Sequence, residues 1–312
     1  MPTSATPTKN DVLAARDRIR QYITQTPLMA SSRLSEICGM DVKFKCENLQ
    51  KSGSFKYRGA SNAILALSDD EKKRGVATHS SGNHGSALAA VAQRLGVTAT
   101  IVVPRGASAF KRRAIERYGG IIVDCSDTLD EREAKLAEVV GRSDAVFIPP
   151  YDDPAIIAGQ GTVGLEIERY GDAVDEVWVP VGGGGLAAGT VLACESAQVV
   201  GAEPELAGDA HQSLVAGERQ PAMPPLTCAD GLRTALGKLN FHLLQEYALP
   251  INLVGESEII AAQKLLMSCL KLVIESSSAV PFAALMKYGA ARTGSERVVI
   301  VLTGGNVNLD GL

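Results

Sequence analysis

Residues 176–192 read EVWVPVGGGGLAAGTVL, an apolar segment followed by four consecutive glycines and a second apolar segment. The first segment has the length and valine content of a buried strand, and the second has the alanine and leucine content of a helix. Because the four glycines carry no side chains, their backbone N–H groups can approach a phosphate at the N-terminus of that helix. The stretch therefore predicts a strand, a phosphate-binding loop and a helix in succession.

Strands and helices alternate along the rest of the chain. Short strands are expected at 98–103, 121–124 and 145–148, with helices at 108–118 and 128–140 between them. Longer strands are expected at 176–181, 198–203 and 297–302, with helices that begin at Pro154, Leu186, Glu256 and Ser278. This alternation indicates α/β architecture, so we expect two open, mostly parallel sheets, one small and one large.

Composition narrows the range of partners. The chain has 312 residues, of which 46% are hydrophobic, and a formal net charge of −4. An acidic protein repels nucleic acid and anionic membranes, so we expect neither as a partner. The N-terminus is polar and no apolar run approaches the ~18 residues of a membrane helix, which predicts a cytoplasmic protein. The six cysteines form no C-x-x-C pair, as expected of reduced thiols.

A second stretch, residues 52–60 (SGSFKYRGA), places the amine of Lys56 among small residues. The alternation of residues 42–47 predicts a half-buried strand before it, and Gly53 and Ser54 supply a turn and a helix cap. Lys56 is then expected in the first turn of a helix, where the helix dipole disfavours the ammonium form. A neutral amine attacks carbonyl groups, so Lys56 has the character of a lysine that forms a Schiff base with a cofactor. From this stretch alone, a solvated surface lysine is the alternative.

Two further loops add to the pattern. Residues 78–85 (THSSGNHG) place small and amide-bearing side chains before an apolar helix that Gly96 ends, which predicts an anion cradle suited to a carboxylate. Residues 303–306 (TGGN) close the last predicted strand and add a hydroxyl group. One amine, one carboxylate cradle, one phosphate cradle and one hydroxyl are the components of a pyridoxal-phosphate site.

In this order and spacing, from about Thr26 to the C-terminus, the motifs resemble those of the fold type II pyridoxal-phosphate enzymes, in the serine racemase and serine/threonine dehydratase family. The resemblance implies an α/β fold like that of the tryptophan synthase β subunit. It implies a large cofactor-binding domain at 1–74 and 152–312 and a small inserted domain at 75–151. Pyridoxal 5'-phosphate is expected in the cleft between the two open sheets, and the family suggests a homodimer that acts on a small amino acid.

The resemblance also assigns roles to single residues. Lys56 would anchor the cofactor and take the α-proton, and Ser81 would stand on the opposite face of the substrate as a second acid or base. The expected cofactor-binding residues are Phe55, Lys56, Asn83, Gly182, Gly183, Gly184, Gly185, Leu186 and Thr303. The expected substrate-binding residues are Ser80, Ser81, Asn83, His84, Arg132 and Tyr151. A structural loop histidine is the alternative for His84, and a charged helix face is the alternative for Arg132.

The acidic segment after the strand at 198–203 resembles the family's divalent-cation site. Its expected ligands are the carboxylates of Glu203 and Asp209 and the carbonyl of Ala207. Hard oxygen donors of this kind suit magnesium or calcium. From the spacing alone, a solvated acidic loop is the alternative.

The expected reaction is α,β-elimination of water from a small β-hydroxy amino acid such as L-serine, L-threonine or 3-hydroxyaspartate, giving an α-keto acid and ammonia. In the family, Thr303 would face the pyridine nitrogen of the cofactor. A neutral hydroxyl there makes the ring a weaker electron sink, which favours loss of the β-substituent. Serine racemisation is the alternative within the family.

Two rivals come from other functional classes. Gly183-x-Gly185-x-x-Ala188 follows a strand and Glu203 ends the next one, which is the pattern of an NAD-dependent dehydrogenase. That hypothesis leaves Lys56, the 78–85 loop and Thr303 without a role. A binding protein of this fold without catalysis is the third class, and it would be expected to lack Lys56.

Overall fold

The computed structural model describes residues 6–170, 173–289 and 296–308, whose strands form two sheets. The larger sheet has the strand order β1 (Leu28–Ala30), β2 (Asp41–Cys46), β10 (Arg297–Leu302), β7 (Glu176–Pro180), β8 (Gln198–Pro204), β9 (Ile251–Val254). The smaller sheet has the order β5 (Ile121–Cys125), β4 (Ala99–Pro104), β3 (Val76–Thr78), β6 (Val146–Phe147). Among these strands only β1 and β2 pair in antiparallel fashion. The predicted class, α/β with two mostly parallel sheets, is confirmed.

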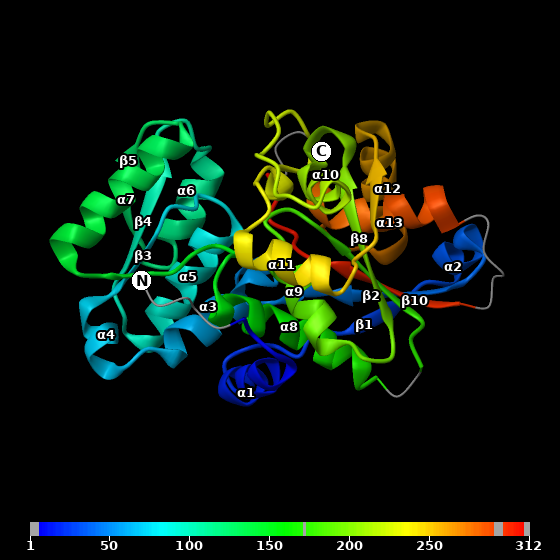
Figure 1. Ribbon diagram of the computed structural model, residues 1–312, viewed down its shortest axis with the longest axis horizontal. Coiled ribbons are helices and arrows are strands. Elements are labelled where there is room, and N and C mark those ends of the chain that lie inside the picture. The colour runs from blue at the N-terminus through cyan, green and yellow to red at the C-terminus, as the bar shows by residue number, and fades with distance from the viewer. Residues whose placement is uncertain (1–5, 171–172, 290–295, 309–312) are drawn as a thin grey trace.

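Helices cover both faces of each sheet (Figure 1). One face of the larger sheet carries α9 (Gly185–Ala193), α8 (Pro154–Glu168) and α1 (Lys9–Ile19), and the other carries α13 (Ser276–Tyr288), α12 (Glu256–Leu270) and α2 (Ser32–Cys38). Around the smaller sheet, α5 (Asn83–Leu95) and α6 (Ala109–Glu116) lie opposite α7 (Leu129–Ser143). The other α-helices are α3 (Lys56–Ala66), α4 (Asp69–Arg74), α10 (Asp209–Ala216) and α11 (Lys238–Glu246).

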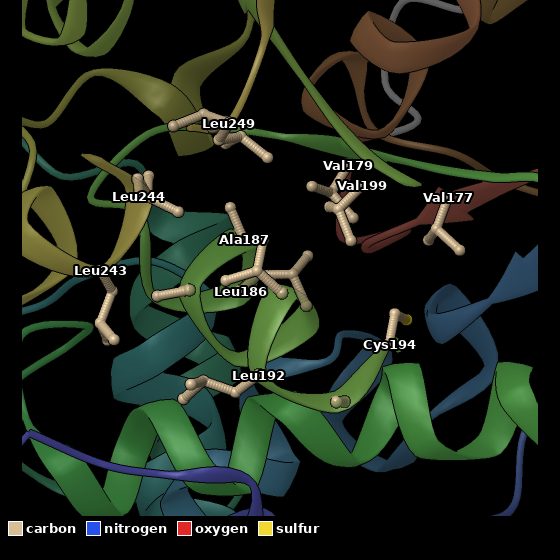
Figure 2. Close-up of a cluster of buried hydrophobic side chains, with 14 of the residues drawn as sticks. Val177, Val179, Leu186, Ala187, Leu192, Cys194, Val199, Leu243, Leu244 and Leu249 are labelled. Atoms are coloured by element: carbon tan, nitrogen blue, oxygen red, sulfur yellow. The ribbon is translucent and has the colours of Figure 1, made fainter. Parts of the chain in front are cut away.

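Alternate side chains of the central strands point into two separate hydrophobic cores. Val177, Val179 and Val199 leave β7 and β8 on the side of α9, where they gather with Leu186 (Figure 2). Trp178, between two of these valines, belongs to the core under α12 and α13 and has no exposed surface. Such two-sided burial is expected of parallel strands covered by helices on both faces. It fixes the register of the sheet and therefore the place where each strand ends.

A cluster of buried charges joins β2, α3 and α8. Arg58 is fully buried, with Nε 2.7 Å from Glu47 Oε2 and Nη1 2.7 Å from Glu166 Oε1. Lys45, also fully buried, places Nζ 2.6 Å from Glu166 Oε2. Burial opposes ionisation of Glu47, but the charge and hydrogen bonds of Arg58 outweigh burial and hold the pKa of Glu47 below its ordinary value. The desolvation of each charge is offset only while its partners are present.

The structure corrects three local expectations. β2 is not half-buried, because Lys45 turns into the charge cluster. Ser54 does not cap α3; it forms a bridge with Gly304, and Phe55 occupies the N-cap position without a side-chain hydrogen bond. The strands β1, β3 and β9, of three or four residues each, were not predicted. The four strands of the smaller sheet lie between Val76 and Phe147, and the domain bounds proposed from the sequence stay a prediction.

Replacing Arg58 by Met should lower the free energy of unfolding by about 3–5 kcal/mol, because two buried carboxylates would then share the single cation of Lys45. The control is Lys73→Met, which breaks a pair with Asp70 in which both side chains are largely exposed. That variant should lose far less, since water screens an exposed pair. Urea unfolding of both variants measures the difference, and equal losses would contradict a structural role for the cluster.

Candidate active site

The predicted motifs meet where the carboxyl ends of the strands of both sheets face one another. In the larger sheet, β2, β10 and β7 are parallel neighbours and lead to Lys56, Thr303 and the glycine tetrad (residues 182–185). In the smaller sheet, β3 leads to the loop at 79–83 and β6 leads to Pro150 and Tyr151. Parallel strands collect their following loops at one edge, which is where α/β proteins bind ligands. Figure 1 shows α3 and α9 between the two sheets.

Lys56 is the first residue of α3 and so lies in the first turn of a helix, as the sequence predicts. Its Nζ donates to the carbonyl of Pro150 over 2.8 Å and lies 5.0 Å from the centre of the Phe55 ring. Burial lowers the pKa of Lys56 to about 8, and the nearby carboxyl group of Glu275 opposes the shift. The amine is therefore partly unprotonated near neutral pH and contacts both halves of the molecule.

Asn83 is the first residue of α5, and its side chain forms hydrogen bonds with residues that pack around the larger sheet. Its Nδ2 lies 3.1 and 3.0 Å from the two carboxylate oxygens of Glu275, and its Oδ1 accepts from Asn306 Nδ2 over 2.8 Å. Two fixed partners hold the amide in one orientation. Ser80 and Ser81 precede it in the same loop, and the carbonyl of Ser80 packs so closely on Gly85 that a Cβ there would collide with it. The loop is thus a rigid turn at the N-terminus of a helix, as expected of an anion cradle.

Glu275 is a site residue that the sequence analysis missed. It stands at the N-cap of α13, and only 6% of its surface is exposed. Burial raises the pKa of Glu275 to about 7, although the hydrogen bond from Asn83 opposes the shift. A glutamate before three serines has no distinctive sequence signal. Only the contact between α13 and α5 reveals it.

His84 has the environment of a structural residue. Its ring is buried and Nε2 lies 3.1 Å from the carbonyl oxygen of Ile148, which only an N–H can approach as a donor. Burial, with the charge of Lys56, lowers the pKa of His84 to about 3, so the imidazole is neutral. This bond ties the start of α5 to the end of β6. The structural alternative for His84 is therefore the better supported one.

The glycine tetrad links β7 to α9 in the predicted way, and its packing excludes side chains. Gly184 has φ +88°, and Cβ atoms at Gly182 and Gly185 would lie 3.0 Å from Leu232 and 2.9 Å from the carbonyl of Tyr151. The ring of Tyr151 packs directly on Gly183. A side chain at any of these positions would displace a neighbour, so the loop presents backbone to the site. Leu186 follows it in α9 and is buried.

Two residues that the sequence analysis missed support the tetrad. Asn240 Nδ2 donates to the carbonyls of Gly183 over 2.6 Å and Tyr151 over 3.2 Å. The carboxylate of Asp152 accepts from the N–H groups of Lys238 and Leu239, which caps α11. Because the Gly183 carbonyl is bonded to Asn240, the backbone N–H groups of the tetrad are the groups that remain to bind an anion. Neither residue stands in a motif, because both act across long chain separations.

Thr303 is buried at the end of β10, and its carbonyl accepts from the N–H of Phe55 over 3.0 Å. This bond fastens the start of α3 to the end of the strand. The hydroxyl of Thr303 lies 3.0 Å from the hydroxyl of Ser278 in α13. Two of the predicted cofactor-binding residues, Phe55 and Thr303, therefore lie side by side at the start of α3.

Ser81 and Arg132 line one open hollow of about 300 Å³, together with Ser108 and Lys111. Arg132 uses Nε for a 3.3 Å hydrogen bond to the carbonyl of Thr128 within its own helix. Lys111 Nζ lies 2.7 Å from Asp230 and so bridges the two sheets. The hollow carries the cations of Arg132 and Lys111 and the carboxylate of Asp127, and it borders the carboxylate cradle at Ser81. The sequence did not reveal this place for Lys111.

The predicted cation ligands come together at the end of β8. Glu203 is fully buried, and its carboxylate accepts from the N–H groups of Ala210 and His211 over 3.2 and 2.7 Å. Asp209 accepts from the N–H of Leu236 over 3.1 Å. Burial raises the pKa of both carboxyl groups, that of Asp209 to about 6, and each lies close enough to affect the other. The described residues hold no group of three His, Cys, Asp or Glu placed for a metal, so a site here needs a carbonyl such as that of Ala207.

The residues around Lys56 fit pyridoxal phosphate. A backbone-lined tetrad suits the phosphate, an amine with a lowered pKa suits the aldehyde, and a fixed amide at Asn83 suits a ring hydroxyl. The dinucleotide alternative fits worse, because the carboxylate of Glu203 is buried against α10 and is not open to a ribose. Among the described helices, none has the length and apolar composition that crossing a membrane requires.

Comparison with known proteins gives the same answer. A family model for pyridoxal-phosphate dependent enzymes matches residues 19–304. The chain is 42% identical to the beta-hydroxyaspartate dehydratase of Paracoccus denitrificans over 98% of both proteins. It is 38% identical to the L-threo-3-hydroxyaspartate ammonia-lyase of Saccharomyces cerevisiae over 97% of this chain and 94% of the relative. The crystal structure of serine racemase from Dictyostelium discoideum superposes with a TM-score of 0.93 at 41% identity, covering 98% of this chain and all of the other. The chain therefore belongs to the family of pyridoxal-phosphate dependent enzymes, with fold type II, as its motifs predict.

Proposed function

We propose that the protein is a dehydratase that converts a small β-hydroxy amino acid to an α-keto acid and ammonia by α,β-elimination. The observation that carries the proposal is the amine of Lys56, whose lowered pKa and position between a carboxylate cradle and a phosphate cradle suit a residue that binds a cofactor and moves a proton. The dehydratase and ammonia-lyase names of two close relatives support the reaction class.

Each part of the site has a separate task. When bound, pyridoxal phosphate supplies an electron-withdrawing ring that acidifies the α-C–H bond of an amino acid. Lys56 holds this group and accepts the α-proton at Nζ, which is partly unprotonated at working pH. The N-terminus of α5, with Ser80 and Ser81 before it, binds the substrate carboxylate. The tetrad binds the phosphate, and Asn83 orients the ring through its fixed amide.

The hollow beside Ser81 bears on substrate choice. Arg132 and Lys111 both line it, and Ser81 stands at its border. A β-carboxylate extending from the carboxylate cradle would pair with Arg132, because Asp230 already pairs with Lys111 and the carboxylate of Asp127 also lines the hollow. Serine and threonine offer Arg132 no such charge. We therefore place 3-hydroxyaspartate first among the candidate substrates, ahead of L-serine and L-threonine. Tyr151 packs on Gly183, so its ring lies beside the tetrad.

Serine racemisation is the second candidate function. The observation that favours it is Ser81, which precedes Asn83 in the cradle and borders the open hollow rather than the core. A hydroxyl on the face opposite Lys56 would return a proton to the α-carbon with inverted configuration. Close similarity to a serine racemase agrees with this possibility. The family match argues against the remote alternative, an NAD-dependent dehydrogenase. The lowered pKa of Lys56 argues against a binding protein without catalysis, because such a protein does not need a reactive amine.

We also propose a divalent cation, magnesium or calcium, at Glu203, Asp209 and the carbonyl of Ala207. Two buried carboxyl groups with raised pKa values support it, because among the described residues their hydrogen-bond partners are backbone N–H groups and a bound cation would offset their burial. Its task would be to brace the segment that joins β8 to α10. The homodimer and the cytoplasmic location expected from the sequence stay predictions.

Removing the cation should destabilise the protein. At free magnesium about 100 times the dissociation constant, binding contributes about 2.7 kcal/mol, so a chelator should lower the melting temperature and added magnesium should restore it. Glu203→Gln should abolish this response. The control is Glu205→Gln, an exposed neighbour paired with Lys287, which should keep it. If the melting temperature of the wild type does not change with chelator and elemental analysis finds no metal, the cation proposal is contradicted. The carboxylate of Glu203 would then serve only to cap the N–H groups of Ala210 and His211.

Exchanging Ser81 for Ala should separate the two candidate activities. Formation of D-serine from L-serine should fall by roughly 10²–10⁴-fold, the usual effect of losing an acid or base, because the proposal assigns the proton on that face to Ser81. Keto-acid release from 3-hydroxyaspartate should fall less, because Lys56 alone takes the α-proton. Both products are followed for L-serine, L-threonine and 3-hydroxyaspartate.

The matched control is Ser80→Ala, which removes a hydroxyl from the same loop and should weaken both activities alike through carboxylate binding. If Ser81→Ala reduces both activities equally, Ser81 serves only to position the substrate. A wild type that forms no D-serine would exclude racemisation. A wild type that releases no keto acid from any of the three substrates would contradict the proposed dehydratase.

A further inference from the structure

The short 3-10 helix η4 (Asp230–Leu232) is fixed to the phosphate-binding side of the site. The N–H of Gly231 donates to Oγ of Ser277 in α13 over 3.0 Å. Leu232 packs on the glycine tetrad, since a Cβ at Gly182 would lie only 3.0 Å from the Cα of Leu232. η4 therefore keeps its place relative to the tetrad and α13, on the side of the larger sheet.

α6 belongs to the opposite wall of the site. Ser108 caps this helix by accepting from the N–H of Lys111 over 3.4 Å, and Ile115 is buried in the core that α6 shares with α5. Figure 1 shows α6 on the side of the smaller sheet that faces the larger one. Ser108 and Lys111 also line the open hollow beside Ser81. α6 is thus fixed to the smaller sheet and supplies part of the wall of the hollow.

One ion pair joins these two segments. Nζ of Lys111 lies 2.7 Å from Oδ2 of Asp230, and the two side chains are 36% and 43% exposed. Lys111 stands in the first turn of α6, where the helix dipole disfavours an ammonium and where no acidic residue offsets it. Asp127 and Arg132, the other charged residues that line the hollow, lie on the side of the smaller sheet. The pair with Asp230 therefore ties this charged wall to the opposite side.

We propose that Lys111 and Asp230 are positioning residues that form a latch, whose ion pair holds the two walls together and keeps the substrate beside Ser81. The inference rests on the proposed function, because it needs the substrate to lie in the hollow. An exposed ion pair changes an equilibrium by up to about five-fold. Loss of the latch should lower the closed population by that factor, so the substrate should bind more weakly while turnover at saturation stays the same.

Direct binding of the substrate carboxylate by Lys111 is the competing explanation. The contact with Asp230 argues against it, because the ammonium would first have to leave a carboxylate that is already in place. Exchanging the two charges, Lys111→Asp together with Asp230→Lys, separates the two roles. The exchange re-forms the pair in reverse, but it puts a carboxylate where direct binding needs a cation.

Hydrogen–deuterium exchange of the cofactor-loaded protein without substrate tests the latch independently of turnover. Asp230→Asn and Lys111→Gln should each speed exchange in residues 105–111 and 227–237 by up to about five-fold, because the walls separate more often. The charge exchange should return both segments toward the wild-type rate. Salt at about 1 M should speed exchange in the wild type but not in Asp230→Asn, because salt screens an exposed pair.

The matched control is Asp124→Asn, which breaks the 2.8 Å pair of the adjacent Arg112 on the side of the smaller sheet alone. It should leave exchange in residues 227–237 at the wild-type rate. With any of the three β-hydroxy amino acids that releases keto acid, Asp230→Asn should raise KM by up to about five-fold at unchanged kcat, and Asp124→Asn should not.

Wild-type exchange rates in both folded single variants would overturn the latch. A folded charge exchange that stays as fast as the single variants would overturn it as well, because the effect would then belong to Lys111 or Asp230 alone. If the exchange rates follow the expected pattern but none of the three substrates releases keto acid, the proposed function is contradicted and the ion-pair latch is not.

Discussion

The rest of the structure depends on the buried charge cluster of Arg58, Glu47, Glu166 and Lys45. Charged side chains that are buried away from water are stable only when each one is paired with an opposite charge in good geometry. The ion pairs of this cluster therefore allow few arrangements of β2, α3 and α8. Arg58 lies two residues after Lys56, and the cluster therefore fixes the start of α3. The bond from the Phe55 N–H to the Thr303 carbonyl fastens the same segment to β10. These contacts hold the segment that carries the reactive amine in a defined position.

Two ionisable groups of the active site, unlike those of the cluster, are not paired with opposite charges. Lys56 and Glu275 are buried without the close opposite charge that each would need for ordinary ionisation, and their pKa values, about 8 and about 7, move toward neutrality. Groups of this kind can gain or lose a proton at working pH. The pair also joins the sheets, since Lys56 bonds to Pro150 after β6 and Glu275 bonds to Asn83 at the start of α5. The contacts that join the two sheets therefore involve the same groups that can exchange a proton.

Local signals in the sequence predicted the fold class, the glycine tetrad, the helix start at Lys56 and the loop before Asn83. Each of these depends on residues adjacent in the chain, such as glycines that exclude side chains. Long-range contacts were not predictable in this way. Lys45 appears in an alternating pattern yet pairs with Glu166, 121 residues away. Glu275, Asp152 and Asn240 have no motif of their own, because their partners come from other elements. Ser54 looked like a cap, although tertiary bridging to Gly304 decides its place.

The central claim is that Lys56 alone, among the lysines near the cleft, binds pyridoxal phosphate covalently. Borohydride reduction of the loaded protein, followed by proteolysis and mass spectrometry of the peptides, tests it directly. The account predicts one reduced cofactor per chain, located on Lys56, because Lys45 is held by Glu166 and Lys111 by Asp230. Reduced cofactor on another lysine, or none on Lys56 at saturating cofactor, would contradict the account.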